Sequence, residues 1–92
     1  EIHTGQYANA SNSEELDLEL KKIIKATEYA HSLGLQVNAG HGLTIENTKA
    51  IAAINNVVEL NIGHSIIARS LFVGLANATA EMKQLIQEAR SQ

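Results

Sequence analysis

Two stretches of the chain, residues 35–40 and 57–62, alternate between apolar and polar positions. The apolar positions are Leu35, Val37, Ala39, Val58, Leu60 and Ile62, and the polar ones are Gln36, Asn38, Glu59 and Asn61. A period of two predicts β-strands with one apolar and one polar face. Residues 1–4 are interpreted as the end of a further strand, so strands are expected near 1–4, 35–40 and 57–62.

Between and after these strands, apolar residues recur at intervals of three and four, which predicts helices. The first helix follows a polar loop, residues 5–12, with Ser11 or Ser13 expected as its cap and Gly34 at its end. Its apolar face contains Leu16, Leu20, Ile23, Ile24 and Ala30. A second helix is expected to begin at Thr44 and to stop at Asn55, and two more are expected over residues 65–73 and 77–90.

The alternation of strands and helices predicts an α/β fold with parallel strands and right-handed crossovers. The polar strand face is interpreted as the lining of a barrel lumen, although an open, solvated sheet face would give the same pattern. Three strands cannot close a (β/α)₈ barrel, which needs eight. A stable chain of this kind is therefore expected to need the rest of the sheet, as a covalent or a nicked partner. A small free-standing α/β fold is the alternative.

Composition narrows the possible partners. The formal net charge is -3, and acidic residues balance Lys21, Lys22 and Lys25 on the first helix. No basic surface is predicted, so nucleic acid is not an expected partner. No apolar run reaches the length of a membrane span. The chain has no cysteine, which agrees with a cytoplasmic location and removes thiolate chemistry.

Three of the four histidines, His3, His41 and His64, fall at or just after the predicted strand ends. Ligands bind at this edge of α/β folds, so these side chains are candidates for a site, although hydrogen-bonded packing would also explain each one. His31, near the end of the first helix, is assigned a structural role. Imidazoles with Glu1 could hold zinc, but no pair has the local spacing typical of a zinc site, so no metal is expected.

Glycines follow two successive strands, in Gly40-His41-Gly42 and in Gly63-His64. Glycine lets the backbone turn sharply and lets N–H groups approach a ligand closely, although tight turns alone would also use it. The helix starting near Ser65 offers free N–H donors and a positive dipole end, which favour phosphate. Glu1 and His3 share a strand face, where a carboxylate beside imidazoles can move protons, unless Glu1 is merely an exposed residue.

The same segments resemble the pyridoxine 5′-phosphate synthase family over essentially the whole chain. The resemblance is carried by three blocks: Glu1-Ile2-His3-Thr4-Gly5 with Tyr7-Ala8, Val37-Asn38-Ala39-Gly40-His41-Gly42-Leu43, and Glu59-Leu60-Asn61-Ile62-Gly63-His64 with Ile66-Ile67 and Arg69. It implies that residues 1–92 are the C-terminal part of one (β/α)₈ barrel domain, completed by an N-terminal remainder. These would be the last three strands, with an extra short helix at a phosphate site. It also implies a homo-oligomer, commonly an octamer.

The resemblance implies a reaction and roles for five residues. The family condenses 1-deoxy-D-xylulose 5-phosphate with 3-amino-2-oxopropyl phosphate, giving pyridoxine 5′-phosphate, phosphate and water without a metal or organic cofactor. His41 matches the proton donor and Glu1 the transition-state-stabilising carboxylate, while Gly42, Gly63 and His64 match substrate phosphate positions. Further catalytic residues belong to earlier strands, so this chain alone is expected to be inactive. A stand-alone phosphate-binding or interaction module, and a different phosphate-binding barrel enzyme, are the other hypotheses.

Overall fold

The computed structural model describes residues 1–91, which alternate between short strands and helices. In chain order the elements are β1 (Ile2–His3), α1 (Gly5–Ala8), α2 (Ser13–Ser32), β2 (Val37–Gly40), α3 (Thr48–Ala52), β3 (Val57–Asn61), α4 (His64–Val73) and α5 (Leu75–Arg90). The three strands form one parallel sheet in the order β1-β2-β3. The predicted parallel α/β arrangement is confirmed for these residues, and each strand is shorter than its predicted range.

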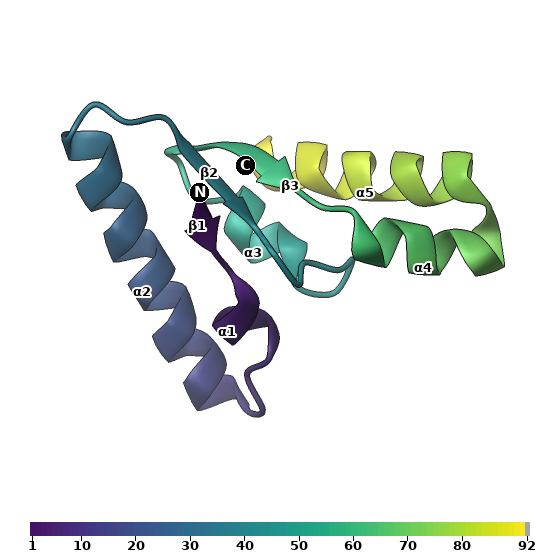
Figure 1. Cartoon of the computed structure of the whole chain (residues 1–92), viewed down its shortest axis with the longest axis horizontal. Coiled ribbons are helices and arrows are strands. Elements are labelled where there is room, and N and C mark those ends of the chain that lie inside the picture. Colours follow the sequence, from purple (N-terminus) through teal and green to yellow (C-terminus); the bar gives the residue numbers. More distant parts are fainter. Residues whose placement is uncertain (92) are drawn as a thin grey trace.

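Figure 1 shows the sheet in the middle of the molecule, with α2 to one side and the antiparallel pair α4 and α5 to the other. Gly74, whose φ of 85° favours glycine, lets the chain reverse between α4 and α5. The C-terminal end of α5 is held against the end of α3, because Arg90 donates hydrogen bonds to the carbonyls of Ala52 and Ile54. None of the helices in residues 1–91 combines the length and apolar character needed to cross a membrane.

The core lies between the sheet and the helices that cover one of its faces. Its buried side chains are Tyr7, Ile23, Val37, Ala39, Leu43, Ile51 and Val57. On α2, the predicted face is only partly buried: Ile23 and Thr27 are buried, but Leu16 is exposed. The phenol of Tyr7 donates to the Asn47 carbonyl at 2.7 Å, which joins the segment after β1 to the segment after β2.

The strand register places polar positions together on the face opposite this core. Ile2 pairs with Ala39 and Ala39 with Leu60, whereas the next row contains His3, Gly40 and Asn61. Successive residues of a strand point to opposite faces, so the first row faces the helices and the second faces away. This row is the one from which a site at the strand ends can be built.

Two positions of the predicted strands depart from the expected apolar face. Leu35 was expected to share that face with Val37 and Ala39, but it lies before β2 and is 57% exposed. Val58 was expected to share an apolar face with Leu60 and Ile62, but it is 66% exposed, while Val57 is buried. The pairing shifts between Val37 and Asn38, so that Val37 faces Val57 and Asn38 faces Glu59. Val58 is therefore an extra residue in β3, and a β-bulge reverses the alternation that the sequence suggests.

Two helix starts also differ from the prediction. Neither Ser11 nor Ser13 caps α2; the Asn12 side chain accepts the Glu15 N–H, while the Glu15 carboxylate accepts from the Ser11 N–H and hydroxyl. This arrangement resembles a capping box, except that the Glu15 carboxylate accepts from the residue before the cap rather than from the cap itself. The expected loop 5–12 contains the one-turn helix α1. Thr44 opens a hydrogen-bonded turn rather than a helix, and α3 begins only at Thr48.

Candidate functional site at the strand ends

A cleft of about 440 Å³ opens at the C-terminal ends of β2 and β3. Its lining residues are His41, Gly42, Leu43, Thr44, Asn61, Ile62, Gly63, His64 and Ser65. Four of the five residues singled out from the sequence, His41, Gly42, Gly63 and His64, are therefore brought together. The fifth, Glu1, bonds to a residue of this lining, as described below.

The turn after β2 places His41 in an unusual backbone conformation. His41 has a φ of 97°, and it is the one residue other than glycine with positive φ in the part of the chain that the structure describes. The hydroxyl of Thr4, itself fully buried, donates to the His41 carbonyl at 2.6 Å. This bond stabilises a conformation that costs about 1–3 kcal/mol in a residue with a side chain.

Gly42 follows with a φ of 74° and lies against α1. A Cβ atom on Gly42 would approach the Ala8 Cβ to 2.7 Å, which is closer than two carbons can lie without displacement. Glycine is required here both by the backbone angle and by the contact with α1. The backbone of the turn is therefore exposed at the cleft without a side chain over it.

The imidazole rings of His3 and His41 stack on each other. Their centroids lie 4.2 Å apart and their planes differ by 27°. The Gly5 N–H donates to the His3 Nδ1 at 3.2 Å. The predicted histidine pair at the ends of β1 and β2 is thus in direct contact, whereas His64 reaches the cleft from the start of α4.

Glu1 reaches β3 by passing over Gly40 of the intervening strand. The Asn61 amide donates to the Glu1 Oε2 at 2.6 Å. A Cβ atom on Gly40 would lie 2.9 Å from that carboxylate oxygen and 2.9 Å from the Asn61 carbonyl. The missing side chain at Gly40 is what allows a carboxylate on β1 to contact an amide on β3. The Glu1 carboxylate is thereby held at the edge of the cleft that Asn61 lines.

The start of α4 presents unpaired backbone donors to the cleft. Gly63 is the N-cap of α4, and no side chain caps the first turn. The first N–H groups of a helix have no partner within the helix, and the dipole makes this end positive. The Ser65 hydroxyl donates to the Leu43 carbonyl at 2.6 Å, which fixes this helix end against the turn after β2. The arrangement is suited to bind an anion.

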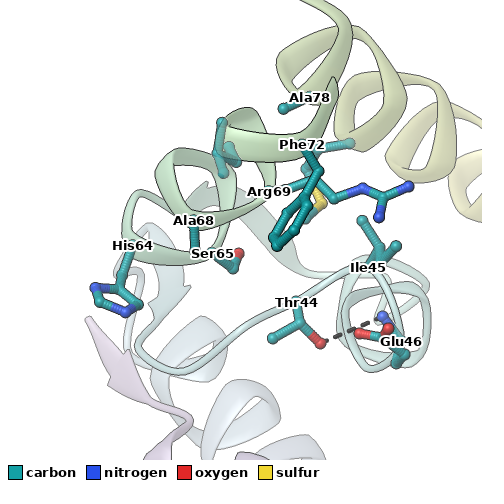
Figure 2. Close-up of a pocket in the computed structure, with 11 residues that line it drawn as sticks. Thr44, Ile45, Glu46, His64, Ser65, Ala68, Arg69, Phe72 and Ala78 are labelled. Atoms are coloured by element: carbon teal, nitrogen blue, oxygen red, sulfur yellow. Dashed lines mark hydrogen bonds between the residues drawn. The ribbon is translucent and has the colours of Figure 1, made fainter. Parts of the chain in front are cut away.

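A second hollow, of about 350 Å³, shares Thr44, His64 and Ser65 with the cleft and is drawn in Figure 2. Ile45, Phe72, Ala78 and Met82 contribute apolar groups to it, and Arg69 pairs with Glu81 at its border. Figure 2 shows the His64 ring at the N-terminal end of α4, away from Phe72 and Arg69. The histidine therefore lies where the two hollows meet, since it lines both this one and the cleft at the strand ends.

Two titrating groups away from the cleft have shifted pKa values. Burial raises the pKa of the Tyr7 phenol above its ordinary value of 10.0. Hydrogen bonds from the Ser11 backbone and then from its hydroxyl lower the pKa of the Glu15 carboxyl below 4.5. Among residues 1–91, no three histidine, aspartate or glutamate side chains lie close enough together to hold a metal ion.

Four residues that shape the cleft were not identified as site residues from the sequence. They are Thr4, Gly5, Asn61 and Ser65. Asn61 was recognised only as a polar strand position, although its alternation with Leu60 placed it on the correct face. The hydroxyls of Thr4 and Ser65 give no pattern along the chain, because their carbonyl partners are 37 and 22 residues distant.

Comparison with known proteins agrees with the resemblance seen in the sequence blocks. The pattern of the family described as "Pyridoxal phosphate biosynthesis protein PdxJ" matches residues 1–88. Proteins named pyridoxine 5′-phosphate synthase are similar to the chain over nearly its whole length. The protein of Coxiella burnetii (strain RSA 493) is 60% identical over 90 residues, or 98% of this chain, and that of Colwellia psychrerythraea is 56% identical over 91 residues, or 99%.

The matched relatives are considerably longer than the sequence described here. The chain spans 38% of the Coxiella protein and 37% of both the Colwellia protein and the Idiomarina loihiensis protein, to which it is 54% identical. The cleft described above lies within this shared segment, since the match includes β1, the turn after β2 and the start of α4. With its family pattern matched from residue 1 to residue 88, this chain belongs to the PdxJ family of pyridoxal phosphate biosynthesis proteins.

Proposed function

We propose that this chain supplies the last three βα units of a (β/α)₈ barrel that synthesises pyridoxine 5′-phosphate. The observation that carries the proposal is the cleft that gathers His41, Gly42, Gly63 and His64 at the carboxyl ends of parallel strands. In barrel enzymes the active site lies at this end, and phosphate commonly binds where the last loops meet a short extra helix. Here α4 is that helix.

Several features support a larger barrel. Within residues 1–91, the outer edges of β1 and β3 have no strand partner, and a polar row crosses the face opposite the helices. Open edges of this kind favour aggregation unless other strands cover them. Leu71 and Phe72 of α4 are 82% and 85% exposed, as expected for surfaces that other parts of a larger assembly cover.

The proposed substrates are 1-deoxy-D-xylulose 5-phosphate and 3-amino-2-oxopropyl phosphate, condensed to pyridoxine 5′-phosphate with release of phosphate and water. The substrate 3-amino-2-oxopropyl phosphate would bind at Gly42, Gly63 and His64. The uncapped N–H groups at the start of α4 and the exposed backbone at Gly42 supply donors for its oxygens. No metal or organic cofactor is part of the proposal.

In this reaction His41 would act as the proton donor and Glu1 as the carboxylate that stabilises a cationic transition state. Condensation of an amine with a ketone and closure of a pyridine ring require repeated proton transfers, which an imidazole performs near neutral pH. The hydrogen bond from Asn61 fixes the Glu1 carboxylate beside the same cleft. The remaining catalytic groups would come from earlier strands, so the described chain alone would be inactive. A homo-oligomer, commonly an octamer, is expected by the same resemblance, and the cysteine-free sequence agrees with a cytoplasmic location.

Two measurements test this proposal. Intact mass spectrometry under denaturing conditions is expected to find a polypeptide heavier than 9.9 kDa, or a second polypeptide that supplies the other strands. Phosphate release is then measured with both substrates for the whole protein, His41→Ala and His31→Ala. His31 lies in the last turn of α2, shortly before β2 begins, and so is near the amino ends of the strands rather than the carboxyl ends.

We expect His41→Ala to lower kcat by roughly 10²–10⁴-fold, the usual contribution of general acid–base catalysis, and His31→Ala to leave it unchanged. Equal activity of wild type and His41→Ala would refute the assigned role. A single folded, monodisperse species of 9.9 kDa would refute the barrel. If that species also bound inorganic phosphate, the chain would be a phosphate-binding module.

A further inference from the structure

We infer that His3 is a positioning residue, whose imidazole fixes the orientation of the His41 ring at the cleft. This inference deepens the proposed function and rests on it, because it assumes that His41 transfers a proton. The rings stack with centroids 4.2 Å apart, although both side chains are exposed. An exposed histidine without such a neighbour samples several rotamers, and an aromatic contact selects one of them.

His3 is itself held in place by the backbone that follows it. The Gly5 N–H donates to the His3 Nδ1 at 3.2 Å, so this nitrogen is the acceptor, and the neutral ring carries its proton on Nε2. A neutral ring can lie against His41 whether His41 is protonated or not, whereas two stacked imidazolium ions would repel each other. The contact is therefore compatible with a His41 that gains and loses a proton during the reaction.

The same short segment also holds the backbone of His41. Thr4, between His3 and Gly5, donates its hydroxyl hydrogen to the His41 carbonyl at 2.6 Å. Thr4 fixes the main chain of His41 and His3 contacts its ring, so two consecutive residues determine where the proton donor lies. Neither contact involves the substrate, which distinguishes these residues from catalytic ones.

Gly5 completes the arrangement, because a side chain there would occupy the place of the rings. A Cβ atom on Gly5 would lie 2.6 Å from the His3 Cε1 and 2.9 Å from the His41 Cδ2. Gly5 begins α1 and does not have a positive φ, so its backbone conformation is open to alanine. The need for glycine at this position comes from the two rings, and Gly5→Ala displaces them without straining the helix.

The test uses the whole protein and compares His3→Ala, His3→Phe and Gly5→Ala, with His31→Ala as the matched histidine control. We expect His3→Ala to lower kcat by roughly three- to tenfold, the factor that corresponds to one aromatic pair, with KM unchanged. His3→Phe retains the aromatic face and should restore most of the lost kcat. Gly5→Ala should lower kcat at an unchanged thermal midpoint, since a displaced proton donor slows the reaction in an intact fold.

A second readout does not depend on activity. The stacked His3 ring should shift the NMR signals of the His41 ring protons upfield. His3→Ala should lose this shift and His3→Phe should retain it. Unchanged His41 signals and unchanged kcat in His3→Ala would overturn the inference. If His41→Ala instead retained full activity, the proposed function would fail, while the ring signals would still show whether His3 orients His41.

Discussion

His41 combines a side chain proposed to donate a proton with a backbone angle that disfavours any side chain, so its replacement should separate stability from activity. Its φ of 97° lies in the region that favours glycine. The strain in a residue with a Cβ atom is about 1–3 kcal/mol. Glycine avoids this strain but loses about 0.5–1 kcal/mol more than alanine through backbone entropy. The balance favours His41→Gly over His41→Ala by up to about 2.5 kcal/mol in free energy of unfolding.

The comparison isolates the backbone because both variants lack the imidazole ring. Both also retain the His41 carbonyl that accepts the Thr4 hydroxyl. Lys83, exposed in the middle of α5, provides the control, because its φ is not positive. At Lys83 the order should reverse, with glycine less stable than alanine by about 1 kcal/mol.

Urea unfolding of the protein that carries this chain measures the difference, provided that the slope m is the same for all four variants. Both variants of His41 should have lost catalytic activity, so the more stable one is no more active. If His41→Ala were as stable as His41→Gly, while the Lys83 pair showed the normal order, the turn would carry no strain. The account of Thr4 as the residue that stabilises it would then be wrong.

Three further predictions concern other contacts of the described chain. Asn61→Ala removes the donor to Glu1 and should lower kcat by about tenfold, the factor for a hydrogen bond to a charged group. The secondary structure measured by circular dichroism should not change, and an unchanged kcat would mean that this bond does not position the carboxylate. Gly42→Ala meets both a φ of 74° and the Ala8 Cβ, so it should lower the free energy of unfolding by about 1–3 kcal/mol and raise the KM for the aminoketone phosphate. Because the pKa of Glu15 is lowered in the folded state, the contribution of this carboxylate to stability is complete above pH 4.5 and is lost as the pH falls through the lowered pKa. The difference in free energy of unfolding between wild type and Glu15→Gln should therefore shrink over that pH range. A difference that is constant with pH would contradict the hydrogen bonds from Ser11 to the Glu15 carboxylate.

Periodicity along the chain was sufficient to predict the order of the strands and of the helices other than the one-turn helix α1, and the residues near the strand ends. The alternation in residues 35–40 correctly placed Val37 and Ala39 inside, because one strand face must meet the apolar faces of the helices. The glycines and histidines that follow the strands were predicted to lie together, since parallel strands bring their carboxyl ends to one edge. Four of them line one cleft.

Local patterns failed where a neighbouring segment decided the outcome. Val58 matches the alternation of its own strand, yet the pairing of β3 with β2 makes it an extra residue and turns it outward. Ser11 and Ser13 are both good capping residues, yet Asn12 between them is the cap, because its side chain accepts the Glu15 N–H. Such choices between adjacent residues depend on energy differences smaller than those that a sequence pattern reports.

The sequence by itself determined the parallel α/β plan, the family and the residue types at the strand ends, because these depend on periodicity and short motifs. The tertiary structure alone decided how those residues meet. It brings His3 against His41, carries Glu1 over Gly40 to Asn61, and leaves the first turn of α4 uncapped beside them. The physical reason is that these contacts join residues far apart in the chain, through strand register and through the space that glycine leaves open.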